Sequence, residues 1–379
     1  MPDATGSDDA GSAGTSASGS DASSSGASEG GPATPPGCES AAVIGRAVQV
    51  SEGPSLLPAA AGFECAVHAV WLQGSELVHR ASSDGGAEWS SEHSLASGLQ
   101  NYGVRPGIAA NGDVLVAIWA ADTIDDAPQL WTAHSENEGE SWSTPEELGK
   151  GRSPAVLINQ AGSRYALWTD NGIQCREYDS AWSPAQTVLD LPDGWNNLDA
   201  VVAGTAIHVA LWTLTPDGTR QVRYMRSSQG CENWTDAIPL AEPLEIPGPG
   251  QYIGEPHPAI AASEQRVAVV WSDVPHGDAP EMEAKYVYVR TSSNGGQSFE
   301  DAVRLDPSPG TAVTIGSKDV AVAGSTIRVL TSAGQFATAP DGTWSAVNPN
   351  QAGDVLATGN DWTGVVGLDG ATLQFMRIE

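Results

Sequence analysis

Short runs of alternating apolar residues recur along the chain, and tryptophan closes five of them. These runs are "AVHAVW", "VLVAIW", "RYALW", "IHVALW" and "RVAVVW", which end at Trp71, Trp119, Trp168, Trp212 and Trp271. The five tryptophans are 48, 49, 44 and 59 residues apart. Alternation with a period of two is typical of β-strands, and self-similarity at this spacing predicts a β-propeller.

Each repeat unit is predicted to contain four strands separated by polar turns. The pattern is clearest over residues 104–148, where "VRPGIAAN", "VLVAIWAAD", "QLWTAHS" and "ESWSTPEEL" are separated by "GD", "TIDDAP" and "ENEG". Gly, Asn and Asp between alternating runs are typical of hairpin turns. No stretch has an apolar stripe with a helical period, so the sequence predicts an all-β protein.

Six complete units fit the chain, and a seventh unit is incomplete. The complete units lie near residues 56–98, 104–148, 152–190, 197–242, 255–305 and 314–348. Residues 352–379 offer only three strands, and the segment "AAVIGRAVQV" at 41–50 supplies a fourth. A ring closed in this way leaves no free sheet edge. We therefore predict seven four-stranded antiparallel blades closed by an N-terminal strand, with six blades as the alternative.

A polar turn follows the third strand of several units. Ser82, Asp84, Gly86 and Trp89 form the pattern Ser-x-Asp-x-Gly-x-x-Trp. Two further turns keep the pattern with conservative replacements, at Ser135, Asn137, Gly139 and Trp142, and at Ser292, Asn294, Gly296 and Phe299. Another turn is degenerate, with Cys231 where Gly is expected. The pattern resembles the Asp-box, or bacterial neuraminidase repeat, of sialidase-like β-propellers.

The residue types of this turn point to a structural role. Asp or Asn accepts hydrogen bonds from backbone N–H groups, Gly adopts a positive φ, and the aromatic residue anchors the turn on the blade. The resemblance implies that the turn joins the third and fourth strands, on the face away from the ligand site. We therefore expect these turns to stabilise the fold and not to contact a ligand.

Residues 1–37 differ in composition from the rest of the chain. They contain no Lys, Arg or aromatic residue and are rich in Ser, Gly, Ala and Asp. Such a segment cannot bury enough apolar surface to offset its chain entropy. The sequence therefore predicts a disordered tether at 1–37 and a propeller at 38–379.

The charge of the chain argues against some classes of partner. Asp and Glu number 47 against 17 Lys and Arg, which gives a net charge of −30. No basic stripe is present, so we expect neither nucleic acid nor an anionic membrane surface as a partner. No run of 18 apolar residues and no signal peptide is visible. The tether is nevertheless typical of an exported cell-surface protein, so we expect a leader that was trimmed or that lies outside this reading frame.

The four cysteines are compatible with two disulfides in an oxidising compartment. We expect the pairs Cys38–Cys65 and Cys175–Cys231, the second of which would link neighbouring repeats. No cysteine lies in a Cys-x-x-Cys or Cys/His arrangement, so the sequence does not support zinc or thiol chemistry.

By resemblance, ligands bind to the loops that precede each first strand and to those between the second and third strands. These loops carry the candidate ligand-binding residues Tyr102, Trp195, Tyr252, His257 and His276. Aromatic planes beside carboxylates and amides are suited to sugar recognition. The acidic loop 273–283 offers oxygen ligands for Ca²⁺ but has no defined ligand register, so we expect a solvated loop and no cofactor.

A sialidase needs more than this fold. By resemblance, it needs three arginines that clamp the substrate carboxylate, a Tyr nucleophile paired with Glu, and an Asp acid/base. The candidates in this chain are Arg105, Tyr252 with Glu255, and Asp126. The Tyr and Glu of sialidases come from different blades, and Arg105 directly precedes Pro106, so the full constellation cannot be assembled.

The sequence leaves three functions open. We expect an exported, monomeric cell-surface propeller that binds extracellular glycans or protein partners through its loop face. The alternative is an exo-α-sialidase or related glycoside hydrolase with a divergent active site. A structural surface module without a small ligand is the third possibility, because a fold does not fix a function.

Overall fold

The computed structural model describes residues 46–100, 104–124, 127–191, 196–214, 219–243, 258–273, 286–305, 319–323, 326–331, 334–338, 343–348, 355–358, 363–369 and 371–377. Every regular element in these residues is a β-strand, as the sequence predicts. The described residues contain no helix long and apolar enough to cross a membrane. They all belong to one unit, Pro35–Glu379, and the predicted tether at 1–37 lies outside them.

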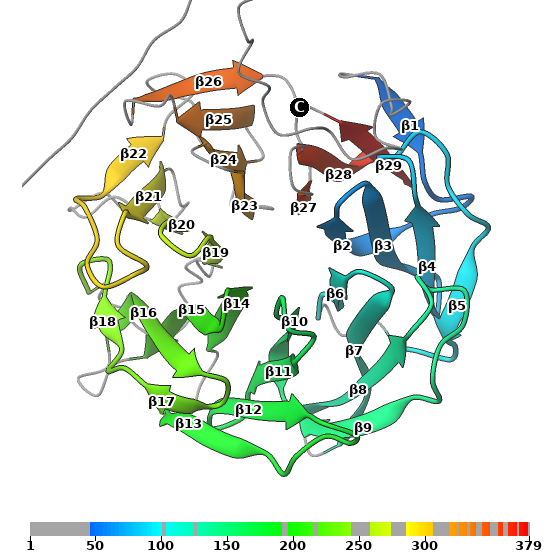
Figure 1. The fold of residues 1–379 in the computed structure, drawn as a ribbon, viewed down its shortest axis with the longest axis horizontal. Helices are drawn as coiled ribbons and strands as arrows, with labels where there is room; N and C mark the ends of the chain where they lie inside the picture. Colours follow the sequence, from blue (N-terminus) through cyan, green and yellow to red (C-terminus); the bar gives the residue numbers. More distant parts are fainter. Residues whose placement is uncertain are drawn as a thin grey trace, which may run out of the picture. The chain divides into compact units, whose positions relative to one another are not determined.

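Seven sheets of antiparallel strands are arranged as the blades of a propeller (Figure 1). We number the blades in the chain order of their innermost strands. Blades 1 and 2 consist of β2 (Leu56–Phe63), β3 (Ala66–Gln73), β4 (Glu76–Ser82) and β5 (His93–Ala96), and of β6 (Gly107–Asn111), β7 (Val114–Ile124), β8 (Ala127–Ser135) and β9 (Glu146–Lys150). Blades 3 and 4 consist of β10 (Arg152–Ile158), β11 (Arg164–Thr169), β12 (Gly172–Tyr178) and β13 (Gln186–Asp190), and of β14 (Asn197–Ala203), β15 (Ala206–Leu214), β16 (Arg220–Gln229), β17 (Glu232–Trp234) and β18 (Ile238–Pro239).

The remaining blades follow the same order. Blades 5 and 6 consist of β19 (Ala259–Ala262), β20 (Val267–Asp273), β21 (Tyr286–Ser292) and β22 (Val303–Leu305), and of β23 (Asp319–Ala323), β24 (Thr326–Thr331), β25 (Gly334–Thr338) and β26 (Trp344–Asn348). Blade 7 consists of β27 (Val355–Thr358), β28 (Thr363–Asp369), β29 (Thr372–Arg377) and β1 (Ala47–Gln49). In blade 4 the outer edge is divided, because β17 and β18 both pair with β16.

The ring is closed by the N-terminal strand. β1 pairs with β29 in antiparallel register and forms the outermost strand of blade 7. Beyond β1, the N–H groups of Val50 and Ser51 donate to the carbonyl of Leu373, and the N–H of Leu373 donates to the hydroxyl of Ser51 at 2.8 Å. The prediction of seven blades closed by an N-terminal strand is confirmed, and the six-blade alternative is excluded.

The core lies in the joints between adjacent blades. In the part of the chain that the structure describes, seven apolar clusters fill the seven joints. The second strand of each blade contributes to the joints on both of its faces, which is why its apolar runs are nearly continuous. Among the repeat tryptophans, Trp71, Trp119, Trp168 and Trp271 pack against the preceding blade, whereas Trp212 packs against the following blade.

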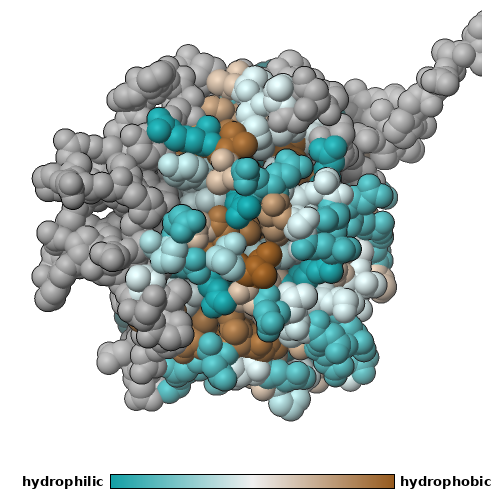
Figure 2. Space-filling view, turned by 90° about the vertical axis from the view of Figure 1, so that its left-hand side faces the viewer, coloured by the Kyte–Doolittle hydropathy of each residue, from teal (hydrophilic) through white to brown (hydrophobic). Residues whose placement is uncertain are grey.

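On the side of the ring shown in Figure 2, most of the coloured residues at the surface are hydrophilic. Small apolar patches lie between polar side chains on the side of the ring shown in Figure 2. Two exposed large hydrophobic residues belong to outer strands that Figure 1 places on this side, Ile238 in β18 and Val303 in β22. They are 38% and 41% exposed and stand in different blades, so they do not make a single large apolar surface.

Candidate functional site

The two faces of the ring are built from different parts of each blade. Every blade runs outward from its innermost strand in the same order (Figure 1), so all innermost strands begin on one face. Antiparallel strands alternate in direction, so the turns between third and fourth strands lie on the opposite face. We call these the first-strand face and the turn face. The predicted ligand loops belong to the first-strand face.

Asp199 lies near the beginning of β14 in blade 4. Its Oδ1 atom accepts a hydrogen bond from the backbone N–H of Ala200 at 2.9 Å. Its Oδ2 atom accepts one from the backbone N–H of Ile260, in the innermost strand of blade 5, at 2.9 Å. The carboxyl group therefore joins the innermost strands of two adjacent blades.

Asp319 repeats this arrangement two blades further on, at the beginning of β23 in blade 6. Its Oδ1 atom accepts the backbone N–H of Val320, and its Oδ2 atom accepts that of Leu356 in blade 7, both at 2.8 Å. The two aspartates thus occupy equivalent places in blades 4 and 6.

The electrostatics of this pair are unusual for carboxyl groups. Burial, together with the smaller effect of the neighbouring charge of Asp319, raises the pKa of Asp199 to about 7. Burial also raises the pKa of Asp319 to about 6. The accepted backbone hydrogen bonds act in the opposite direction, because they stabilise the charged form, but burial has the larger effect.

Arg105 contributes a positive charge to the same region. It precedes β6 of blade 2, and the attraction of its guanidinium lowers the pKa of both Asp199 and Asp319. Blades 2, 4 and 6 thus each supply a charged group from the beginning of an innermost strand, and these groups act on one another. A guanidinium donates hydrogen bonds to an anion, whereas a carboxyl group with a pKa near neutrality can donate or accept a proton near pH 7.

A buried polar network fixes the beginning of β14. Thr213 donates a hydrogen bond to Oδ1 of Asn196 at 2.8 Å, and Thr169 donates to the carbonyl oxygen of Asn196 at 3.2 Å. Ser153 donates to Oδ1 of Asn197 at 3.0 Å. These bonds connect blades 3 and 4 and hold the strand that carries Asp199. Its position is therefore set by a rigid part of the fold.

Of this charged group, Arg105 is a candidate residue predicted from the sequence, and the two aspartates are not. Arg105 precedes β6 and lies on the first-strand face. The other predicted residues lie outside the described residues, namely Tyr102, Asp126, Trp195, Tyr252, Glu255, His257 and His276. So does the acidic loop beyond Asp273, and the described residues contain no group of three or more His, Cys, Asp or Glu placed to hold a metal ion.

The two missed aspartates carry a signal in the sequence. They interrupt apolar strands, in "NLDAVVA" at 197–203 and "DVAVA" at 319–323. An Asp in such a run is costly to bury unless it is hydrogen-bonded, so it marks a place where the fold uses the carboxyl group.

Several other arginines serve the fold. Three of them stand on third strands, and each binds a carbonyl next to the turn of its own blade and a carbonyl of the preceding blade. Arg80 donates to the carbonyl oxygens of Ser90 and Val50, Arg176 to those of Ser183 and Leu148, and Arg290 to those of Glu300 and Leu240. These three guanidinium groups are engaged in the joints and do not add to the charge around Arg105.

On the turn face, the turn of blade 1 forms a closed set of hydrogen bonds. The hydroxyl of Ser82 donates to Oδ1 of Asp84 and accepts the N–H of Gly86, both at 2.8 Å. The N–H groups of Ala87 and Glu88 donate to the same Oδ1 at 3.0 Å. The turns 135–142 and 292–299 repeat this pattern with Asn137 and Asn294. We call 82–89, 135–142 and 292–299 the polar turns.

The glycine of each polar turn lies on a ring of the preceding blade. Gly86 has φ +90°, and a Cβ atom there would overlap the ring of Phe375 in blade 7. Trp89 packs edge-on against the same ring, with centroids 5.7 Å apart. In the other two polar turns the glycine also lies directly against a ring of the preceding blade, Gly139 against His79 and Gly296 against Tyr224. Only glycine fits this close approach with this backbone conformation.

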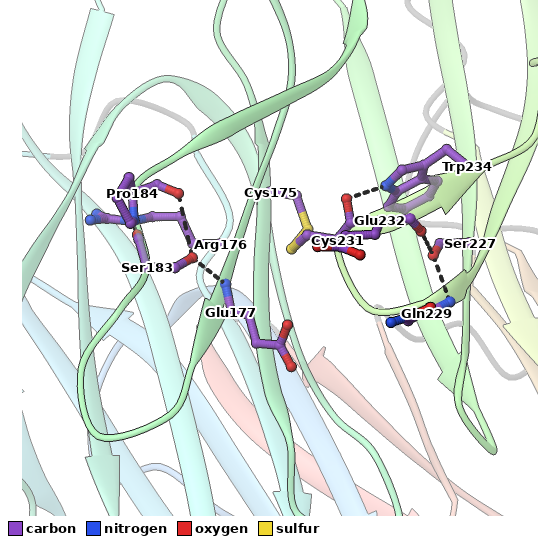
Figure 3. Close-up of a disulfide and its surroundings, with 10 residues drawn as sticks. All are labelled: Cys175, Arg176, Glu177, Ser183, Pro184, Ser227, Gln229, Cys231, Glu232 and Trp234. Atoms are coloured by element: carbon purple, nitrogen blue, oxygen red, sulfur yellow. Dashed lines mark hydrogen bonds between the residues drawn. A yellow bond between two sulfur atoms is a disulfide. The ribbon is translucent and has the colours of Figure 1, made fainter.

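At the joint between blades 3 and 4, a disulfide replaces the contact between a turn glycine and a ring (Figure 3). Cys231, in the degenerate turn of blade 4, is bonded to Cys175 on β12, the third strand of blade 3. Both residues are buried, and the Trp234 indole donates to the Cys231 carbonyl at 2.9 Å. The predicted pair is confirmed. Cys65 is also disulfide-bonded, and its expected partner Cys38 lies outside the described residues.

The fold is similar to that of known polysaccharide lyases. Polysaccharide lyase Uly1 aligns with a TM-score of 0.57 and 10% identity over 89% of this chain and 100% of that chain. The PL25 ulvan lyase bound to -[GlcA(1-4)Rha3S]- aligns with a TM-score of 0.56 and 9% identity over 88% and 96% of the two chains. Hadza microbial sialidase Hz136 aligns with a lower TM-score of 0.45 and 13% identity, over 86% and 66%.

These similarities establish the architecture only. The identities are too low to carry a function from one chain to another. No protein-family profile and no curated protein sequence matches this chain. The resemblance to sialidase-like propellers is therefore confirmed for the fold, and the function has to be argued from the site.

Proposed function

We propose that this protein binds acidic glycans outside the cell, at the charged group formed by Arg105, Asp199 and Asp319 on the first-strand face. The observation that carries the proposal is the mutual electrostatic influence of these three side chains, which come from alternate blades. A guanidinium binds a sugar carboxylate or sulfate through paired hydrogen bonds. Asp199, whose pKa is about 7, is protonated in part of the molecules at neutral pH, and Asp319, whose pKa is about 6, is protonated in mild acid. A protonated carboxyl group donates a hydrogen bond to an acidic ligand and repels it less than an ionised carboxylate does.

Three further observations support this proposal. In the sequence, the candidate residue Tyr102 precedes β6, as Arg105 does, and the candidate residue Trp195 precedes β14, which carries Asp199. The ulvan lyase of similar fold is bound to a saccharide that contains GlcA and Rha3S, both acidic units. All described cysteines are in disulfides, which is typical of an exported protein. We infer that the polar turns are Asp-boxes that stabilise the blades, and that the tether carries the propeller at the cell surface.

Binding to an array of acidic and neutral oligosaccharides tests the proposal with the full-length protein. We expect acidic glycans to be bound, and Arg105→Ala to lose most of that binding while remaining folded by circular dichroism. Arg46→Ala is the matched control, because Arg46 is exposed and lies on the segment before β1. Binding only to neutral sugars, or equal binding by the Arg105 variant, would contradict the proposal.

A glycoside hydrolase is the second candidate, and the pKa of Asp199 is the observation that favours it. A carboxyl group with a pKa of about 7 is suited to act as a general acid near neutral pH. Hydrolysis of a fluorogenic α-sialoside between mildly acidic and neutral pH tests this. Turnover that is lost in both Asp199→Asn and Arg105→Ala would establish a hydrolase. The absence of turnover at high protein concentration would leave glycan binding as the function.

A further inference from the structure

Two histidines are buried together in the joint between blades 1 and 2. His68 on β3 is 0% exposed and His79 on β4 is 1% exposed. Nδ1 of His68 lies 3.4 Å from Nε2 of His79, and the rings are nearly parallel with centroids 5.6 Å apart. A distance of this size allows one shared proton between the two nitrogens.

The pair supports the polar turn of blade 2. Gly139 of this turn lies directly on the ring of His79, and Trp142 packs edge-on against it, with centroids 5.1 Å apart. Phe375 and Tyr224 hold the corresponding place beneath the other two polar turns. Among these three joints, therefore, only that between blades 1 and 2 has an ionisable nitrogen base beneath the glycine.

Among the residues that the structure describes, no negatively charged group faces the pair to balance an added proton. Burial lowers the pKa of His68 to about 4. It also lowers the pKa of His79 well below its usual value, and the charges of His68 and His93 lower it further. Glu138 and Glu140 of the facing turn are exposed, and no carboxylate is among the groups that shift either pKa. Nε2 of His68 is buried and has no hydrogen-bond partner within the described part of the chain.

We propose that the joint between blades 1 and 2 is an acid-sensitive latch, which releases the polar turn 135–142 when the His68–His79 pair takes up an extra proton. The extra proton puts a positive charge on the pair, and a charge buried in an apolar joint without a counter-charge is unfavourable unless water reaches it. Water reaches the pair only if the turn above it lifts from β4.

The closed joint becomes less stable in acid because its histidines bind protons more weakly than those of the opened joint do. The unfolded or opened joint binds a proton with the ordinary histidine pKa, whereas the closed joint binds it only near pH 4. The closed state is therefore fully stable above pH 6.5 and loses stability as the pH falls below that value. For one histidine, the opening constant of the turn should increase by roughly 70-fold between pH 7.5 and pH 4.5.

Hydrogen exchange measured by mass spectrometry tests the latch in the full-length protein. Rates are corrected for the intrinsic pH dependence of exchange, and the polar turn 82–89 serves as an internal control, because its glycine lies on Phe375, which does not titrate. Turn 292–299 is not used as the control, because Tyr224 beneath it lies 2.7 Å from Nδ1 of His208, and burial lowers the pKa of His208 to about 4. We expect turn 135–142 to open in acid while turn 82–89 stays protected. His79→Phe should remove the difference, because Phe375 already fills the same place beneath Gly86.

Two results would overturn the latch. One is parallel opening of both turns in wild-type protein, and the other is acid opening of turn 135–142 in His79→Phe at the same pH as in wild type. If the variant does not fold, nuclear magnetic resonance titration of the wild-type histidines gives an independent answer. Ordinary pKa values for both His68 and His79 would also contradict the proposal.

Discussion

The two faces of the propeller use the same residue type in different ways. On the turn face, Asp84 caps its own turn, because it accepts a hydroxyl and two backbone N–H groups within a few residues. On the first-strand face, Asp199 accepts N–H groups from two different blades, and burial raises its pKa to about 7. Local bonds of the first kind stabilise a turn. A half-buried carboxyl of the second kind retains a capacity for proton exchange and ligand binding.

The polar turns stabilise the blades, whereas we propose that the charged group on the first-strand face contacts a ligand. Substitutions on the turn face and in the joints should change the free energy of unfolding and leave ligand binding intact. Substitution of Arg105 should have the opposite pattern, whereas Asp199 and Asp319 also bridge adjacent blades, so their substitution should affect both binding and stability.

The largest stability effect is expected from the disulfide between blades 3 and 4. The bond spans 56 residues, and removing it through Cys175→Ala with Cys231→Ala should lower the free energy of unfolding by about 4 kcal/mol, because the unfolded chain gains entropy. Urea denaturation measures this change. Glycan binding should be retained below the denaturation range, and a loss of binding in the folded variant would show that the joints are not purely structural.

A smaller loss of stability is expected when the glycine of a polar turn is replaced. Gly86→Ala should cost about 3 kcal/mol, since the new methyl group strains the backbone and overlaps Phe375. Gly98→Ala is a matched control, because Gly98 also has a positive φ, +74°, but has nothing within 4 Å of the added atom. It should cost only about 1 kcal/mol. Equal costs in urea denaturation would mean that the contact with Phe375 is unimportant.

The smallest stability effect is expected at the first-strand face, and it depends on pH. The folded protein retains protons on Asp199 and Asp319 that the unfolded chain releases above pH 4, since their pKa values are raised to about 7 and about 6. Their contribution to stability is therefore present in acid and is lost as the pH rises from about 4 to about 7. Asp199→Asn should flatten this slope in urea denaturation curves.

Asp301→Asn provides the control for that experiment, because Asp301 is exposed and lies outside the charged group. Its pH profile should follow that of wild type. The buried histidines give the opposite slope below pH 6.5, so the experiment compares slopes between variants and not the absolute profile.

Much of the fold could be predicted because its signals are local. The tryptophan period, the hairpin residues and the three-strand unit at the end of the chain were enough to predict seven blades and the closing strand. The direction of each tryptophan was not predictable. Trp212 packs toward the following blade although its run looks like the others, because a shift of one residue along a strand reverses the face.

The candidate site was harder to predict because it is formed by residues far apart in the chain. Arg105 was found through a resemblance. Asp199 and Asp319 belong to blades 4 and 6 and come under the influence of its charge only in the folded ring, so their sequence neighbours do not indicate it. The ring that lies beneath the glycine of each polar turn was missed for the same reason. Nothing near Gly86 in the sequence indicates that Phe375 lies beneath it.

The most direct test of the central claim is the affinity for one acidic glycan, selected on the array, in Arg105→Ala and Trp89→Ala by isothermal titration calorimetry. Both variants are measured at a temperature at which they are folded. The structure predicts that Arg105→Ala weakens binding by about tenfold or more, the loss expected for a charge-assisted hydrogen bond, while Trp89→Ala keeps the wild-type affinity and loses only stability. Unchanged affinity in Arg105→Ala, or an equal loss in folded Trp89→Ala, would contradict the division of roles between the two faces.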